Sequence, residues 1–336
     1  QWLATVDFAS HIDKHEPLRL SKTEQQDEAV RARREALKRL SQAAVSLTEE
    51  NPKSYPQALA EEVVKKHQPG TQTLVIVNTV ERAQAVYQAL QDRGDAPATL
   101  LVHARFRPAE RRKINEALGT TPAEGRIVVA TQAIEAGVDI SSRTLFTELA
   151  PWSSLVQRFG RCNRAGEWND QDGADVYWIE VSEPAPYEPD ALGDARTKLE
   201  GPLTSASPKD LPPTDQAAPL VPVIRRRDFL DLFNTEPDLT GFDVDISQYI
   251  RDADDTDVFL FWRNVKEQGI ESQPKPTADE LCRAGIGKAR DFLEKNKTDC
   301  YYWDGLDRTW QKLDRKAYPG MTVMVDIAVG GYDADL

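Results

Sequence analysis

Short runs of wholly apolar residues alternate with helical segments along the middle of the chain, and this alternation restricts the possible folds most. The first run is TLVIVN at 73–78, and comparable runs follow at 99–103, 126–131, 143–149 and 175–181. Residues with helical periodicity lie between or beside them at 55–66, 81–90, 108–118 and 153–162. Strands that are apolar at every position and are joined by helices predict an α/β domain, with a parallel sheet covered by helices on both faces.

The rest of the chain divides by composition. Residues 1–54 are predicted to be a helical N-terminal segment or linker, because 24–47 has apolar residues at roughly helical spacing. Residues 55–182 hold the α/β domain. Nine of the 21 prolines fall within 184–222, so residues 183–222 are predicted to be a linker. Residues 223–336 are predicted to form a smaller, acidic α+β domain with a helix at 223–233, strands at 258–262, 301–303 and 321–329, and a helix within 276–296.

The formal net charge of −13 argues at first against a nucleic-acid partner. Most of that charge lies in residues 183–336, which carry −11, whereas residues 71–182 carry only −2. A local basic strip occurs within 103–113, where four arginines and a lysine accompany one glutamate.

Cys162, Cys282 and Cys300 are too few and too widely spaced for a disulfide framework or a zinc motif. With no apolar run long enough to cross a membrane, the sequence predicts a soluble, cytoplasmic protein.

Polar or basic residues follow each predicted strand, at the edge where ligands bind in sheets of this kind. The sets are NT at 78–79, HARFR at 103–107, TQAIEAGVDI at 131–140 and PWSSLVQRFGRCNR at 151–164. The last set places Arg158, Arg161 and Arg164 three residues apart, along nearly one face of a predicted helix. Three guanidinium groups without a nearby carboxylate predict a bound anion such as the γ-phosphate of a nucleotide.

These segments resemble the motifs of superfamily 2 helicases. QRFGRCNR at 157–164 is similar to motif VI, ATQAIEAGVDI at 130–140 to motif V, and the stretches at 73–84 and 100–112 occupy the places of motifs IV and IVa. The amino-acid sequences of these motifs are most similar to those of the CRISPR-associated helicase-nuclease of type I systems. The resemblance implies that 55–182 is the second RecA-like domain of such an enzyme.

The resemblance also implies roles for individual residues. Arg161 and Arg164 would be arginine fingers on ATP with Gln157 beside them, and Gly137 and Asp139 would lie at the nucleotide, near Arg158. The residues implied to contact the backbone of single-stranded DNA are Asn78, Thr79, His103, Arg105 and Thr131. Hydroxyl, amide and guanidinium donors suit phosphates. Phe106 is expected to be half-buried beneath the following helix, with stacking on a base as the alternative.

Several parts of such an enzyme are missing from the sequence. It has no GxxxxGK[ST] phosphate loop, no Asp-Glu pair after an apolar strand for Mg²⁺, and no His-Asp pair for a nuclease. The chain is therefore expected to be a fragment that cannot hydrolyse ATP alone. It would bind ATP and Mg²⁺ jointly with a first RecA-like domain, and would act with a nuclease domain and a CRISPR RNA-guided surveillance complex. The alternatives are a DEAH-type RNA helicase, a restriction translocase, or a non-catalytic module that docks a protein partner.

Overall fold

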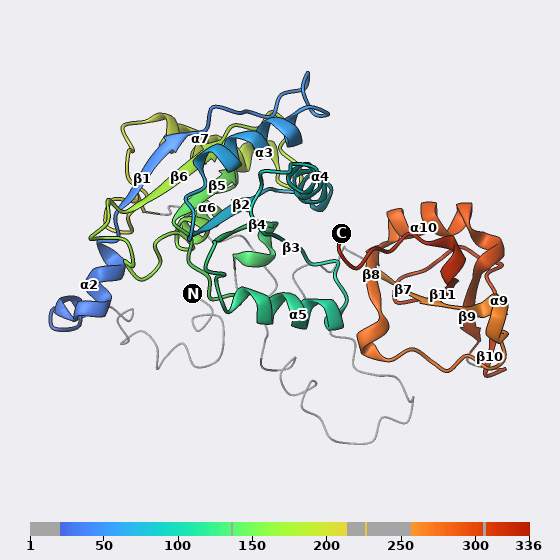
Figure 1. Ribbon diagram of the computed structural model, residues 1–336. Helices are drawn as coiled ribbons and strands as arrows, with labels where there is room; N and C mark the ends of the chain where they lie inside the picture. The colour runs from blue at the N-terminus through green and yellow to red at the C-terminus, as the bar shows by residue number, and fades with distance from the viewer. Residues whose placement is uncertain (1–20, 136, 214–225, 227–256, 305–306) are drawn as a thin grey trace. The chain divides into compact units, whose positions relative to one another are not determined.

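The chain folds into two compact units, each built on its own β-sheet (Figure 1). The computed structural model describes residues 21–135, 137–213, 226, 257–304 and 307–336. The larger unit comprises 22–214, 274–282 and 330–336, and the smaller unit includes 257–273 and 283–329.

The larger unit contains a six-stranded sheet in which every neighbouring pair of strands is parallel. Its strands are β1 (Lys38–Gln42), β2 (Gln72–Ile76), β3 (Thr99–Val102), β4 (Arg126–Ala130), β5 (Thr144–Glu148) and β6 (Ala174–Ile179), in the order β1-β6-β5-β2-β4-β3. All residues of β2, β4 and β5 are buried, as wholly apolar runs predict for strands covered on both faces. The predicted parallel α/β sheet is confirmed.

The helices of this unit are amphipathic segments that bury one face each. They are α3 (Tyr55–Lys66), α4 (Val80–Gln91), α5 (Pro108–Leu118), α6 (Trp152–Phe159) and α7 (Pro189–Glu200), with a short α2 (Glu28–Arg34) before them. Helix α3 packs on α4, and α6 packs on α7. Proline occupies the first turn of α3, α5 and α7, where its missing N–H costs no intrahelical hydrogen bond.

The prediction of one helix over 24–47 is wrong. Asp27 caps α2 by accepting from the N–H groups of Ala29 and Val30, and the helix ends at Arg34. The chain then enters β1, which pairs with β6 in the register Lys38 to Ala174. Leu40 is buried against the core, while Arg39 is exposed. The edge of β6 supplies the hydrogen bonds for β1, and local sequence periodicity cannot reveal such a distant partner.

The prediction of a linker over 183–222 also differs from the structure. Residues 189–200 form α7, which buries Leu192, Ala195 and Leu199 in the core of the larger unit. After α7 the N–H of Ala206 donates to the carbonyl oxygen of Lys38 at 3.0 Å, next to β1. Three apolar side chains at helical spacing thus fix a proline-rich stretch on the domain.

The smaller unit is a mixed five-stranded sheet with one longer helix. Its elements are β7 (Asp257–Arg263), α9 (Val265–Gln268), β8 (Cys282–Gly285), α10 (Ile286–Lys295), β9 (Cys300–Asp304), β10 (Thr309–Lys312) and β11 (Thr322–Asp326). The strand order is β10-β9-β11-β7-β8, with β11 parallel to β7 and antiparallel to β9. This confirms a smaller α+β region, and the helix predicted within 276–296 is α10. The helix predicted at 223–233 lies outside the described residues, Arg226 apart.

Within the described part of the chain, every helix is too short or too polar to span a membrane.

Candidate functional site

The predicted site residues fall at two different ends of the large sheet. Asn78, His103 and Thr131 each follow the carboxyl end of a strand, as predicted. The segment around Arg161 instead lies at the amino end of β5, because the N–H of Ser142, just before that strand, donates to the Arg161 carbonyl oxygen at 2.9 Å. The prediction of four sets on one edge is therefore wrong for the end of the last set, 161–164, whereas Arg158 in the same set bonds to Asn78 at the carboxyl edge. Helix α6 carries the chain from one end of the sheet to the other.

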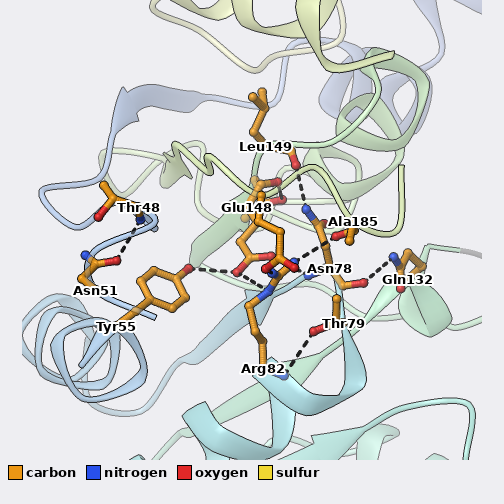
Figure 2. A network of polar contacts seen from close by, with 12 residues as sticks. Thr48, Asn51, Tyr55, Asn78, Thr79, Arg82, Gln132, Glu148, Leu149 and Ala185 are labelled. Carbon is orange, nitrogen blue, oxygen red and sulfur yellow. Dashed lines mark hydrogen bonds and ion pairs between the residues drawn. The ribbon is translucent and has the colours of Figure 1, made fainter. Parts of the chain in front are cut away.

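Asn78 is a buried junction at the carboxyl edge (Figure 2). Its N–H donates to Glu148 Oε2 at 2.7 Å, and its Nδ2 donates to the carbonyl oxygen of Leu149 at 2.8 Å. Its carbonyl oxygen accepts from Gln132 Nε2 at 2.8 Å, and its Oδ1 accepts from Arg158 Nη1 at 3.1 Å. All four polar groups of Asn78 are thus occupied within the protein. Because Asn78 is only 1% exposed, the predicted contact of its side chain with DNA would require a local rearrangement that exposes it.

Glu148, which the sequence reasoning missed, lies at the centre of this network (Figure 2). The carboxylate is fully buried; it accepts from the Tyr55 hydroxyl at 3.0 Å, and its Oε1 lies 3.2 Å from Arg82 Nε. Burial raises the pKa of Glu148, and the charge of Arg82 opposes that rise. Burial also raises the pKa of the Tyr55 hydroxyl well above its ordinary value. A glutamate at the end of an otherwise apolar strand was the signal available in the sequence.

Arg158 is a buried structural residue in this arrangement. Its Nε donates to Glu135 Oε1 at 2.8 Å, and its Nη2 donates to the Tyr187 hydroxyl at 2.9 Å. Its Nη1 donates to Asn78, Thr147 and the Glu148 carbonyl oxygen at 3.0–3.1 Å. Every nitrogen of the fully buried guanidinium group makes at least one hydrogen bond within the protein, so the predicted role of Arg158 at a nucleotide would compete with these bonds.

The three arginines also do not share a helix face, because α6 ends at Phe159 rather than at 162. Buried Lys38 of β1 donates its Nζ to the Phe159 carbonyl oxygen at 2.9 Å, which satisfies one of the last carbonyls of the helix. The chain then turns, and Asn163 has a φ of 44°. A carboxylate accompanies two of the arginines, Arg158 and Arg164, contrary to the prediction.

Arg161 is the exception among the three. Its side chain donates from Nη2 to the Glu135 carbonyl oxygen at 2.6 Å, and its buried Nε has no hydrogen-bond partner within the part of the chain that the structure describes. No carboxylate forms an ion pair with it among the residues that the structure describes. Burial lowers the pKa of Arg161, and the neighbouring charge of Arg164 adds to that effect. A buried guanidinium group with an unused donor is suited to bind an anion.

Two of the other residues predicted at the nucleotide, Asp139 and Arg164, line a pocket. Arg164 Nε lies 2.8 Å from Asp139 Oδ1, in an ion pair whose acidic side chain is 88% exposed. Both residues line a pocket of about 530 Å³ together with Lys38, Ser141 and Gly160. Gly137 has a φ of 75°, a backbone conformation that favours glycine, and Gln157 is exposed on α6. An exposed ion pair contributes little to stability, so Arg164 can exchange Asp139 for another anion at small cost.

His103 is buried at the carboxyl edge. Its ring stacks on Phe106 with centroids 4.0 Å apart, and its Nε2 lies 2.7 Å from the Leu336 carbonyl oxygen. Burial lowers the pKa of the His103 imidazole. Phe106 is buried beneath α5, as expected, rather than presented to a base.

The other residues predicted to contact DNA differ in accessibility. Thr131 is buried, whereas Thr79 is half-buried and caps α4 by accepting from the N–H of Arg82. Arg105 is accessible and pairs with Glu81 at 3.0 Å. Within the basic strip, Arg107 pairs with Glu110 and Arg112 with Asp279. Thr79 and Arg105 are therefore the accessible members of the set.

The comparisons with known proteins point to one family. Residues 69–167 match the model described as CRISPR-associated nuclease/helicase Cas3, C-terminal. This stretch is therefore similar to the C-terminal region of Cas3 proteins. A CRISPR-associated helicase Cas3 of Thermoproteus tenax is 37% identical over 134 residues, which are 39% of this chain and 22% of the relative. The CRISPR-associated endonuclease/helicase Cas3 of Escherichia coli is 34% identical over 113 residues, which are 32% of this chain and 13% of the relative.

The chain thus spans about a fifth or less of the length of these Cas3 relatives. Among solved structures, T. fusca Cas3 with AMPPNP is similar with a TM-score of 0.39 and 25% identity, covering 48% of this chain and 20% of the other. The segment matched to the Cas3 model runs from just before β2 to the turn after Arg164, so it contains both the Asn78 junction and Arg161. The predicted resemblance to the Cas3 helicase family is confirmed.

Proposed function

We propose that this chain is the C-terminal half of an ATP-dependent, Cas3-type DNA helicase and that it supplies arginine side chains to ATP. The observation that carries the proposal is the state of Arg161. It is 8% exposed, and among the described residues its buried Nε has no hydrogen-bond partner and its guanidinium group bonds to a backbone carbonyl oxygen alone. A charged donor held in a poorly hydrated site interacts strongly with the charge that develops during phosphoryl transfer.

The residues near Arg161 fit the phosphates and sugar of a nucleotide. Arg164 would leave Asp139 for a phosphate oxygen, and the Asp139 carboxylate would then be free to accept from a ribose hydroxyl. Gln157 and Gly137 are exposed close to them in the sequence. The residues present do not fit Mg²⁺, because no cluster of three His, Cys, Asp or Glu side chains occurs in the described ranges. A domain with a phosphate loop would hold the metal and the rest of ATP.

The carboxyl edge of the sheet is the proposed contact with single-stranded DNA. The Thr79 hydroxyl and the Arg105 guanidinium group are accessible there, and both can donate to backbone phosphates without reading sequence. His103 and Thr131 lie at the same edge but are buried, so DNA would reach them only after local rearrangement. Asn78 would not contact DNA itself but would hold the adjacent residue Thr79 in position. Arginine and hydroxyl donors on one edge support a strand-tracking surface.

The proposed partners follow from the names of the relatives. They are called CRISPR-associated nuclease/helicases, so we infer that the complete enzyme also has a first RecA-like domain and a nuclease domain. It would act on DNA exposed by an RNA-guided CRISPR complex. The family match favours this function over an RNA helicase, a restriction translocase or a docking module.

The test is Arg161→Ala in the helicase that joins this chain to its phosphate-loop domain. We expect ATP hydrolysis to fall by about 10³-fold or more, as for other arginine fingers, while the Kd for single-stranded DNA changes less than twofold. The chain alone should show no turnover with single-stranded DNA. Equal loss of DNA binding and hydrolysis would indicate a structural arginine, and turnover by the chain alone would overturn the requirement for a second domain.

A further inference from the structure

The two parts of the proposed site lie at opposite ends of the sheet, and a loop runs between these ends alongside helix α6. The loop at 131–142 leaves the carboxyl end of β4 and reaches the amino end of β5. Its first part lies beside Asn78 through the bond from Gln132 Nε2, and its last part lies beside Arg161 through the bond from the Ser142 N–H. A contact that holds this loop in place therefore also helps to hold Arg161 in a constant position relative to Asn78.

Glu135 holds this loop at two points, with different groups. Its carboxylate Oε1 accepts from Arg158 Nε at 2.8 Å, and its backbone carbonyl oxygen accepts from Arg161 Nη2 at 2.6 Å. The Arg158 side chain is fully buried and that of Glu135 is 13% exposed, so water screens their ion pair little. Glu135 thus bonds both to Arg158, which is buried, and to Arg161, which is proposed to contact ATP.

The same contacts continue to the carboxyl edge. Arg158 Nη1 donates to Asn78 Oδ1, and the next residue after Asn78 is Thr79, which is proposed to contact DNA. The route from Thr79 to Arg161 therefore passes through Asn78, Arg158 and Glu135. Thr79 and Asn78 are joined by a peptide bond, and the later steps are hydrogen bonds between groups that are buried or nearly buried. Such bonds allow few alternative geometries.

We propose that Glu135 is a positioning residue that aims Arg161 at the nucleotide and ties its position to the DNA-facing edge. This inference rests on the proposed function. Without the Glu135 carboxylate, the loop at 131–142 loses its hold on Arg158, and the carbonyl oxygen that orients Arg161 is no longer fixed. Displacement of a catalytic group by about 1 Å can lower a rate by about 10²-fold. Glu135 itself contacts no substrate.

The experiment uses the helicase with its phosphate-loop domain and compares Glu135→Gln, Arg161→Ala and the double variant. Glu135→Gln keeps an acceptor for Arg158 Nε and removes only the charge, so it is the milder change; Glu135→Leu removes both. We expect kcat for DNA-stimulated ATP hydrolysis to fall about tenfold with Glu135→Gln and about 100-fold with Glu135→Leu. The Kd for single-stranded DNA should change less than twofold. Asp95→Asn, in an exposed ion pair with Arg93, is the matched control.

The double variant distinguishes positioning from general structural support. If Glu135 acts through Arg161, adding Glu135→Gln to Arg161→Ala lowers kcat no further, because residues that act as a unit are not additive. The inference would be overturned if the two substitutions lowered kcat independently, so that their fold-losses multiplied in the double variant. An unchanged kcat in Glu135→Gln would overturn it as well. If Glu135→Leu fails to fold, the Glu135→Gln cycle still decides. Loss of activity in Arg161→Ala with no effect of Glu135 would defeat this inference alone, whereas full activity in Arg161→Ala would defeat the proposed function.

Discussion

Arg158 Nη1 lies 3.1 Å from Asn78 Oδ1, and this bond joins helix α6 to the second residue after β2. The two residues are 80 positions apart in the chain and are both buried. Both side chains bond mainly within the protein, although both fall in segments that resemble helicase motifs. Their bond shows how the residues next to them, Thr79 and Phe159, are held relative to each other.

Replacement of Arg158 by Met should destabilise the larger unit strongly. The change leaves the buried carboxylate of Glu135 without its partner and removes donors from Asn78 and Thr147. Breaking a buried ion pair on one side costs about 3–5 kcal/mol. Urea unfolding followed by circular dichroism measures the change. Arg93→Met, in an exposed pair with Asp95, is the control and should leave the unfolding midpoint where it was; a similar midpoint for both variants would contradict a buried role for Arg158.

Stability should depend on pH through Glu148. Burial raises the pKa of this carboxyl in the folded protein above its ordinary value of 4.5, so the folded state holds the proton more tightly than the unfolded chain. Its contribution to stability is fully present below pH 4.5 and is lost as pH rises through the folded pKa. The free energy of unfolding, measured by urea from pH 4 upward, should therefore fall more steeply for the wild type than for Glu148→Gln. Parallel curves would show that the pKa of Glu148 is the same in both states.

Asp139→Asn should weaken selection for the ribose while leaving the fold intact. The Asp139 side chain is 88% exposed and its pair with Arg164 is open to water, so the unfolding midpoint should barely change. Loss of a charged acceptor for a ribose hydroxyl should raise the KM for ATP in the helicase by about tenfold. The KM for 2′,3′-dideoxy-ATP should stay constant. An equal rise in KM for both nucleotides would show that Asp139 does not bind the ribose hydroxyls.

Leu192→Ala should destabilise the larger unit, because α7 belongs to its core. Leu192 is 2% exposed, and truncation of a buried leucine to alanine costs about 2–5 kcal/mol. Leu37→Ala is a matched control, since the Leu37 side chain is 47% exposed. Thermal unfolding compares the two variants. If Leu192→Ala melted with the wild type, residues 183–213 would behave as the linker that their proline content indicates.

The parts of the fold that sequence predicts well are those with strong local signals. The apolar run at 73–78 predicts a buried strand, which is β2. Helices α3 and α5 have a proline in the first turn and end at the predicted residues. Strand β1 carried no such signal, since Lys38–Gln42 is mostly polar and is a strand only because β6 lies beside it. The same missing strand explains the wrong end of α6, because Lys38 meets the Phe159 carbonyl oxygen from β1.

Sequence could not separate the three arginines at 158, 161 and 164, which look alike in spacing and type. Their roles are assigned by groups far away in the chain: Glu135 and Asn78 surround Arg158, Asp139 meets Arg164, and Arg161 has no carboxylate in an ion pair among the described residues. Partners of this kind are set by tertiary structure. The buried Glu148 was overlooked for the same reason, since its need for donors becomes visible only when Tyr55 and Arg82 are in place.

The path of the loop at 131–142 has an evolutionary consequence. It must span β5 from end to end, and a strand of five residues is about 16 Å long. An insertion or deletion within the loop would shift Arg161 against Asn78, whereas an added residue at 93–98 or 119–125 changes only the connection between neighbouring elements. Among related proteins we therefore expect the loop at 131–142 to keep a nearly constant length, while those two turns vary freely.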